Sequence, residues 1–244
     1  TAAFDASSGA KLVRINKFDL EYQMQWPSGS QIVYQGPADQ RKVHLFETPD
    51  GIGVVWSEIR DEIDFDLFYQ RYDLDGLPQF DSAGVTLMDG FWVDNYVEGI
   101  YSTPDGDFII VWVDDIWGAG SLKYQKFTLA GQIADSWPSD GYTLSSTGDP
   151  EKLKGSISAS ADGILVAWEE FYNFNKNIKA NIIHWDGSLQ WTGGLLLTTA
   201  ENDQINLELA VDELSQTALV VWEDFQNGND LDIVGQFLDL SNNS

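Results

Sequence analysis

The sequence predicts an all-β protein, a β-propeller of about four four-stranded blades. A segment of about 55 residues occurs four times in the 244-residue chain, and each copy contains short strand-like runs separated by turn residues. No segment keeps the 3.6-residue period of an amphipathic helix. Tandem repeats of this length are typical of propellers, in which each repeat forms one small sheet and neighbouring sheets bury one another.

Each repeat is centred on an apolar run that ends in tryptophan, with an acid two residues later. The tryptophans are Trp56, Trp112, Trp168 and Trp222, spaced 56, 56 and 54 residues apart. The run Phe108-Ile-Ile-Val-Trp112 is apolar at every position, which predicts a strand that is buried on both faces. We therefore expect the four tryptophans to pack in the core between blades.

The rest of each repeat keeps the same phase. An amide follows each tryptophan by 13 or 14 residues, at Gln70, Gln125, Asn181 and Gln236. A turn, an aromatic residue and a β-rich run such as Gly84-Val-Thr-Leu87 follow the amide in the first three copies. We name the four expected strands a, b, c and d in chain order, with the tryptophan in b. The repeats then occupy residues 40–95, 96–150, 151–203 and 204–239.

Residues 1–39 are interpreted as a closing segment of this single propeller domain. Residues 12–19 match strand c, residues 26–33 match strand d, and the last repeat supplies only a, b and c. We expect the N-terminal d strand to complete the C-terminal blade, as in WD-repeat propellers, because this removes open edges. One c strand is then left over. It could lie on the surface, form part of a further incomplete blade, or pair with another molecule.

Charge and composition reduce the number of partner classes and of cellular locations to be considered. The chain has 39 Asp and Glu against 13 Lys and Arg, a net charge of −26, which disfavours nucleic acid and anionic lipid. It has no Cys, and hence no disulfide or thiolate metal site. No apolar run is long enough to span a membrane. We interpret the start at Thr1-Ala-Ala as a processed end, and expect a secreted or cell-surface protein.

The connections between strands b and c concentrate carboxylates and amides. These groups supply the oxygen ligands that calcium prefers, so calcium is the one candidate cofactor. The candidate ligands are Asp64, Asp66, Asp224, Asp230 and Asp232. No EF-hand spacing is present, and Asp and Asn are also the residues that tight turns require. Both interpretations remain open at this stage.

Two tryptophans outside the repeated core are candidates for recognition. Trp92 and Trp117 stand in expected loops beside acids, where an indole can stack on a sugar or be buried in a protein interface. Catalytic motifs are not found: His44 and His184 accompany no Ser and Asp arrangement, and no G-x-S-x-G or P-loop occurs. Acids are too abundant for any pair to stand out as a glycosidase pair. The sequence therefore predicts no enzyme.

The last repeat resembles a repeat of secreted bacterial β-propeller repeat proteins. The resemblance rests on Val220-Val-Trp-Glu-Asp-Phe-Gln-Asn-Gly-Asn-Asp-Leu-Asp-Ile-Val-Gly-Gln-Phe-Leu-Asp239 and extends over residues 11–239. It implies an exported or surface module and brings no catalytic residues with it. The middle copies depart from the pattern, with Gly118-Ala-Gly120 and residues 173–177 where the family has an Asn-Gly hairpin.

These observations lead to an expected function. We expect a non-enzymatic extracellular module that binds other copies of itself, extracellular proteins or glycans, and that self-assembles by strand addition into oligomers or filaments. The alternative is a carbohydrate-binding, lectin-like propeller whose rim aromatics and acids form the site. A glycoside hydrolase is the least favoured reading.

Overall fold

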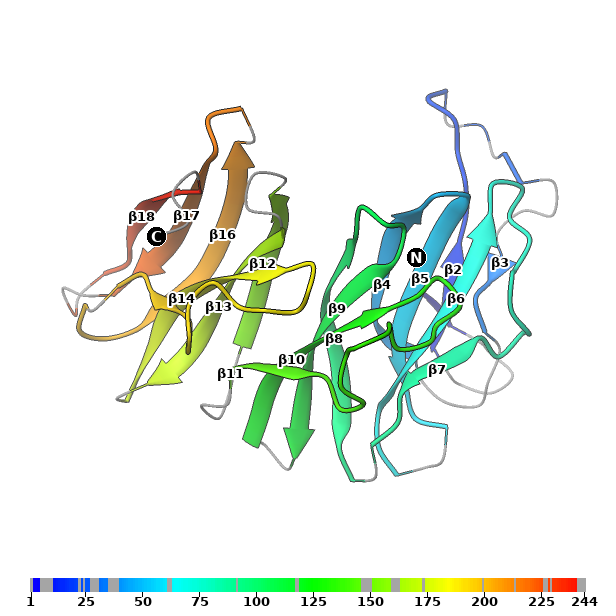
Figure 1. Ribbon diagram of the computed structural model, residues 1–244, viewed down its shortest axis with the longest axis horizontal. Helices are drawn as coiled ribbons and strands as arrows, with labels where there is room; N and C mark the ends of the chain where they lie inside the picture. Colours follow the sequence, from blue (N-terminus) through cyan, green and yellow to red (C-terminus); the bar gives the residue numbers. More distant parts are fainter. Residues whose placement is uncertain are drawn as a thin grey trace.

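The computed structural model describes most of the chain as strands and their connections. The described residues are 2–4, 11–21, 23, 25–26, 31–34, 40–60, 63–90, 92–116, 119–145, 151–158, 163–172, 174–198, 200–212, 214–225, 228 and 230–240. They form 18 β-strands in five antiparallel sheets, which succeed one another from the N-terminal to the C-terminal end of the molecule (Figure 1). Within this described part, no helix capable of crossing a membrane occurs.

We call the five sheets blades 1 to 5 in chain order. Blade 1 contains β1 (Ala2–Phe4), β2 (Lys11–Ile15) and β3 (Gln31–Ile32). Blade 2 contains β4 (Gln40–Thr48), β5 (Gly51–Glu58), β6 (Asp66–Asp73) and β7 (Val85–Met88). Blade 3 contains β8 (Asp94–Ser102), β9 (Phe108–Ile116), β10 (Ala119–Phe127) and β11 (Tyr142–Ser145). Blade 4 contains β12 (Glu151–Ser158), β13 (Gly163–Tyr172), β14 (Asn175–His184) and β15 (Leu195–Leu196). Blade 5 contains β16 (Gln204–Asp212), β17 (Thr217–Asp224) and β18 (Asp232–Asp239).

The all-β, propeller-like architecture is confirmed, but the expected number of blades and the expected closure are wrong. Instead of about four four-stranded blades, the described residues form five sheets, two of which have three strands. Strands β1 to β3 pair with one another, and no strand pairing among the described residues joins blade 1 to blade 5. The N-terminal strands form a separate sheet because their apolar side chains pack on blade 2. Trp26 is 4% exposed and its ring stacks 6.3 Å from that of Tyr72. The surplus c strand, β2, therefore belongs to a further incomplete blade.

The turn after β2 supports the assignment of blade 1 to the repeat. Asp19 Oδ1 accepts hydrogen bonds from the backbone N–H groups of Glu21 and Gln23. In blade 2, the equivalent oxygen of Asp73 accepts from the residues two and four positions later in the same way. The same side-chain-to-backbone turn thus follows strand c in both blades.

Among the described residues, the core consists of four apolar clusters, and each cluster lies between two neighbouring blades. The tryptophan of the following blade is in each cluster, as the repeat predicts: Trp56, Trp112, Trp168 and Trp222 are all buried. Consecutive residues of β5 illustrate the burial of both faces, since Trp56 packs toward blade 1 and Val55 toward blade 3. The middle strands therefore hold the stack of sheets together.

A glycine and an amide fix the connection between strands c and d. Gly194 adopts a φ of +80°, and a Cβ there would lie 2.8 Å from the ring of Trp168. Asn181 closes the same connection, because its Nδ2 donates to the carbonyl of Trp191 at 2.7 Å and its Oδ1 accepts from that residue's N–H at 3.0 Å. Gln70 makes the equivalent bonds in blade 2. The amides of blades 2 and 4 are thus structural, whereas the side chain of Gln125 in blade 3 is buried without a hydrogen-bond partner.

Candidate functional site

A pocket of about 540 Å³ lies between blades 3 and 4. Strand β11 at the outer edge of blade 3 forms one wall, while β14 and the connection after it form the other. The described residues that line it are Tyr124, Tyr142, Thr143, Leu144, Ser145, Glu170, Lys179, Leu189, Thr192 and Gly193. We call this the Tyr142 pocket. Its size is within the range of small-molecule sites.

Three aromatic rings build one end of the Tyr142 pocket. Tyr142 stacks on Tyr124 at 5.5 Å and meets Trp137 edge-on at 5.4 Å. Tyr142 remains 37% exposed, so part of its ring is available to a ligand. The hydroxyl of Tyr124 donates to the carbonyl of Gly187 at 2.8 Å, and burial raises the pKa of that hydroxyl. Tyr124 is therefore a neutral, fixed support for Tyr142.

A buried ion pair builds the other end. Glu170 is 1% exposed, and Lys179 Nζ lies 2.5 Å from its Oε2. Ser145 donates to the other carboxylate oxygen, and Lys179 also donates to the carbonyl of Gly193 at 3.1 Å. A buried carboxylate needs such partners, because an isolated one is very costly to desolvate. The pair places a carboxylate and an ammonium group beside the aromatic end without adding net charge.

Strand register explains why these residues meet. Lys179 on β14 lies directly opposite Trp168 on β13, and Glu170 follows Trp168 by two residues. Residues with this spacing and pairing share one face of a sheet. That face is turned toward blade 3, where Ser145 ends β11. The repeat therefore brings the acid after tryptophan to the boundary between blades.

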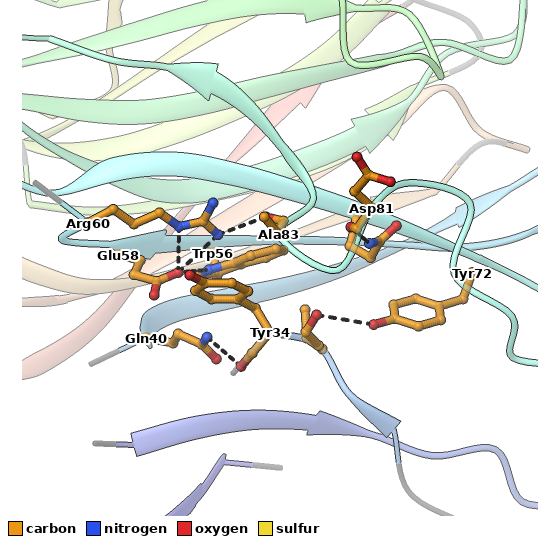
Figure 2. Close-up of polar contacts among 10 residues, drawn as sticks. Tyr34, Gln40, Trp56, Glu58, Arg60, Tyr72, Asp81 and Ala83 are labelled. Atoms are coloured by element: carbon orange, nitrogen blue, oxygen red, sulfur yellow. Dashed lines mark hydrogen bonds and ion pairs between the residues drawn. The ribbon is translucent and has the colours of Figure 1, made fainter. Parts of the chain in front are cut away.

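A related cluster lies between blades 1 and 2 (Figure 2). The buried carboxylate of Glu58 accepts a 2.9 Å hydrogen bond from Trp56 Nε1 and two 3.2 Å bonds from Arg60. Burial raises the pKa of Glu58, while the contacts with Trp56 and Arg60 act in the opposite sense. The Arg60 guanidinium also lies 3.5 Å from the centre of the Phe68 ring and 4.1 Å from that of Tyr34. The cation therefore lies between two aromatic rings, while its side chain remains 23% exposed.

The candidate calcium ligands lie at two separate places. Asp64 and Asp66 are buried and accept hydrogen bonds from the backbone N–H groups of Val93 at 3.1 Å and Gly90 at 3.3 Å. Asp224 is buried in blade 5, where it accepts from the indole of Trp222. Asp230 and Asp232, which belong to the same blade, are exposed. Across the described ranges, no three His, Cys, Asp or Glu side chains are arranged to hold a metal ion. Calcium binding stays a prediction.

Of the two candidate recognition residues, Trp92 lies outside the Tyr142 pocket. Trp92 is 55% exposed, with a φ of +65°, on the loop that Asp64 and Asp66 anchor. This left-handed conformation is unusual for a bulky residue. Trp117 lies outside the described residues. A recognition role for either tryptophan stays a prediction.

The sequence did not single out the residues of the Tyr142 pocket, although one signal was present. Strand c reads as mixed in polarity, yet Lys123 and Lys179 both stand directly opposite a core tryptophan. A lysine at such a position needs a buried acid, and the acid two residues after the tryptophan supplies it. Tyr142, by contrast, is one of many aromatic residues in the chain. Only the packing of two blades shows that it borders a pocket.

Comparisons with known proteins show that the fold resembles that of several solved structures. No protein-family model and no curated protein matches the chain. An α-L-arabinofuranosidase from Fusarium graminearum superposes with a TM-score of 0.56 at 12% identity, over 98% of this chain and 70% of that one. An endo-arabinase from Bacteroides thetaiotaomicron gives a TM-score of 0.51 at 9% identity, over 93% and 85%. A Penicillium chrysogenum α-L-arabinanase complexed with arabinobiose gives 0.50 at 12%, over 95% and 72%.

These comparisons confirm the propeller-like fold and contradict the expected function. The prediction of a non-enzymatic, self-assembling module is wrong, since the three solved structures named above are an arabinofuranosidase, an endo-arabinase and an arabinanase. The prediction that the protein is no enzyme fails with it. The prediction that the protein is no enzyme rested on the lack of local catalytic motifs, whereas self-assembly was expected from the surplus c strand. Glycosidases need only two carboxylates, which a propeller can bring together from distant segments without any motif.

Proposed function

We propose that this protein is a carbohydrate-active propeller that binds a neutral saccharide in the Tyr142 pocket. The observation that carries the proposal is the combination of a partly exposed aromatic ring with a buried carboxylate–ammonium pair in one pocket of about 540 Å³. Sites for small organic ligands have this composition, an apolar lining with a few fixed polar groups. We thus favour the carbohydrate-binding alternative of the sequence analysis over the non-enzymatic, self-assembling module, but with the site in the Tyr142 pocket instead of at the rim.

The chemistry of a sugar matches the two ends of the pocket. A sugar ring has apolar faces, which can pack on the exposed part of Tyr142, and hydroxyls around its edge. Glu170 can accept and Lys179 can donate hydrogen bonds to such hydroxyls, and Thr143 and Thr192 add two further hydroxyl groups to the lining. The net charge of −26 opposes anionic saccharides. We therefore propose a neutral ligand, and choose arabinobiose as the first probe because a matched structure contains it.

Calorimetric titration of arabinobiose and longer arabino-oligosaccharides into the protein tests this proposal. We expect Tyr142→Ala to weaken binding by about tenfold or more, as for other aromatic anchors. Trp92→Ala is the matched control, since it removes an exposed aromatic ring outside the pocket, and we expect it to bind like the wild type. Loss of binding in Trp92→Ala with none in Tyr142→Ala would place the sugar on the rim and overturn the proposal.

A second variant fills the pocket without removing any lining group except a hydroxyl. Tyr34 lies two residues after β3 in blade 1, at the position of the repeat that Ser145 holds in blade 3, and packs there on a cation beside a buried acid. We expect Ser145→Tyr to fill the polar end of the Tyr142 pocket and abolish binding, with a thermal midpoint close to that of the wild type. Unchanged affinity in this variant would move the site elsewhere.

Glycoside hydrolysis is a second candidate function, which a different pair of residues favours. Asp94 on β8 and Asp115 on β9 lie directly opposite each other, so their Cβ atoms are about 5 Å apart. The two carboxyl groups therefore extend from neighbouring positions on one face of blade 3, and retaining glycosidases likewise use two carboxyl groups that lie close together. Hydrogen bonds from the N–H of Phe65 at 3.0 Å and the hydroxyl of Tyr96 at 3.2 Å orient Asp94.

Release of arabinose from arabinan and from chromogenic arabinofuranosides tests the second candidate. We expect Asp94→Asn to lose turnover by at least about a hundredfold if the pair acts on substrate, while Glu47→Gln, an exposed acid outside the pair, keeps it. Wild-type protein that binds arabinobiose and releases no sugar would remove hydrolysis and leave saccharide binding in place.

A further inference from the structure

The boundary between blades 1 and 2 repeats the construction of the Tyr142 pocket. Glu58 and Glu170 both follow the core tryptophan by two residues and are buried at the boundary. A cation binds each acid, Arg60 in one case and Lys179 in the other. Each cation also donates a hydrogen bond to the carbonyl that precedes the glycine packed on the core tryptophan. Arg60 donates to the carbonyl of Ala83, before Gly84, at 2.8 Å, and Lys179 donates to that of Gly193, before Gly194, at 3.1 Å.

The surrounding packing agrees with this equivalence. Trp26 of blade 1 covers the turn glycine of blade 2, since a Cβ on Gly76 would lie 2.6 Å from its ring. Trp137 of blade 3 covers the turn glycine of blade 4 in the same way, at 3.2 Å from a Cβ on Gly187. The two boundaries are therefore copies of one design, which differ in the side chains at their polar ends.

The difference lies in what fills the space beside the cation. Between blades 3 and 4, Ser145 is small and Lys179 is slender, and a cavity remains. Between blades 1 and 2, the ring of Tyr34 lies over the guanidinium of Arg60, which lies in turn over Phe68 (Figure 2 shows Tyr34 and Arg60). A planar ring of the protein itself thus occupies the place beside the ion pair.

We propose that the boundary between blades 1 and 2 is a second site for a neutral saccharide, closed in this structure by the side chain of Tyr34. The inference rests on the proposed function of the Tyr142 pocket, because it assigns the same ligand class to an equivalent place. When Tyr34 moves away, Arg60 keeps its bonds to Glu58 and Ala83 and its stacking on Phe68. Opening the site therefore breaks the cation–π stack of Tyr34 on Arg60 and its packing against the apolar cluster between blades 1 and 2. This loss weakens the second site by at least roughly tenfold relative to the first.

Counting sites by calorimetric titration of arabinobiose into the intact protein tests the inference. We expect one site in the wild type at moderate ligand concentration, and a second of comparable affinity in Tyr34→Ser. Tyr34→Phe is the matched control, because it keeps the ring over Arg60 and must show one site. In the double variant Tyr34→Ser with Ser145→Tyr, we expect one site again, now between blades 1 and 2.

The outcomes separate the inference from the proposed function. Wild-type protein that binds no saccharide overturns the proposed function and the inference built on it. Wild-type protein with one site, together with Tyr34→Ser that retains this site at unchanged affinity and gains no second one, overturns the inference alone. The retained first site shows that the variant is folded, so a failure to gain binding cannot be attributed to unfolding.

Discussion

The indole N–H of Trp56 donates a 2.9 Å hydrogen bond to Oε2 of Glu58, two residues later on the same strand. The same bond joins Trp222 to Asp224 in blade 5, at 3.1 Å. In the two remaining copies of the described core, the indole nitrogens of Trp112 and Trp168 have no hydrogen-bond partner. Their acids pair instead with a lysine on the neighbouring strand. The acid after tryptophan thus satisfies a buried donor in some repeats and a buried cation in others.

Glu58 satisfies both kinds of donor, so its removal should be unusually costly. We expect Glu58→Ala to lower the free energy of unfolding by about 2–3 kcal/mol, because it leaves the Trp56 indole and the Arg60 guanidinium without their acceptor. Asp114→Ala is the matched control: it breaks a partly exposed pair with Lys123 and no indole bond, and should cost less than about 1 kcal/mol. Urea denaturation measures both values. Equal losses would show that the indole bond contributes nothing.

Two adjacent glycines test the packing of strand d on the core tryptophan. Gly193 and Gly194 both have left-handed φ angles, +78° and +80°. A Cβ on Gly193 meets nothing within 4 Å, whereas one on Gly194 would lie 2.8 Å from the ring of Trp168. We expect Gly193→Ala to cost about 1 kcal/mol through backbone strain alone. Gly194→Ala should cost about 2–4 kcal/mol, because the ring must also move. Similar unfolding midpoints for the two variants would contradict this contact.

The sequence was most informative about the fold where the same residues recur. The tryptophans and their apolar neighbours identified the middle strand of each blade, and all four tryptophans are buried as predicted. The sequence contains five expected c strands, yet we expected about four blades from them, and both this number and the predicted closure were wrong. Trp26 shows why. Its ring packs on Gly76 of blade 2, and the sequence around Trp26 does not indicate which blade it packs against. Strand type is a local property, whereas the pairing partner of an edge strand is not.

The candidate site was much less accessible to sequence reasoning. Glu170 and Lys179 are recognisable only once two strands are aligned in register, and Ser145 joins them from another blade. Acids are so frequent in this chain that Asp64 and Asp66 matched a metal-ligand pattern equally well. Their hydrogen bonds to a loop were not visible, because Gly90 and Val93 supply backbone groups rather than side chains.

His44 introduces a pH dependence of stability. Burial lowers its pKa below the ordinary range of histidine, and nearby Lys42 acts in the same direction, while Glu98 and a backbone hydrogen bond at Val97 oppose the shift. As the pH falls, the unfolded chain therefore takes up this proton before the folded protein does. The contribution of neutral His44 to stability is present above the ordinary pKa and is lost as the pH falls through the lowered one.

The variant His44→Gln lacks this titration and is the reference with which the wild type is compared. We expect the free energy of unfolding of the wild type, minus that of the variant, to decrease between pH about 7.5 and about 5. The difference between the two proteins cancels the contribution of the many carboxylates, which are the same in both. A constant difference across this range would show that His44 has an ordinary pKa in the folded protein.

Variants of Asp64 test whether this side chain anchors a loop or binds calcium. Its Oδ2 accepts a 3.1 Å hydrogen bond from the N–H of Val93, at the base of the loop that carries Trp92. We expect Asp64→Ala to lower the free energy of unfolding by about 1 kcal/mol, since the part-buried N–H of Val93 keeps only its longer 3.3 Å bond to the carbonyl of Gly90. Asp64→Asn should lose less, because the amide oxygen can still accept this bond.

The stabilities of the wild type and of both Asp64 variants are then measured with calcium and with a chelator. A hydrogen-bond anchor predicts the same order of stabilities, wild type above Asp64→Asn above Asp64→Ala, in the presence of calcium and of a chelator. A calcium ligand predicts that calcium raises the thermal midpoint of the wild type and leaves that of Asp64→Asn unchanged, because a bound ion stabilises the folded state that holds it. We expect the first result, since the hydrogen bond accounts for the burial of this carboxylate. The second would instead place a calcium ion where the sequence predicted one.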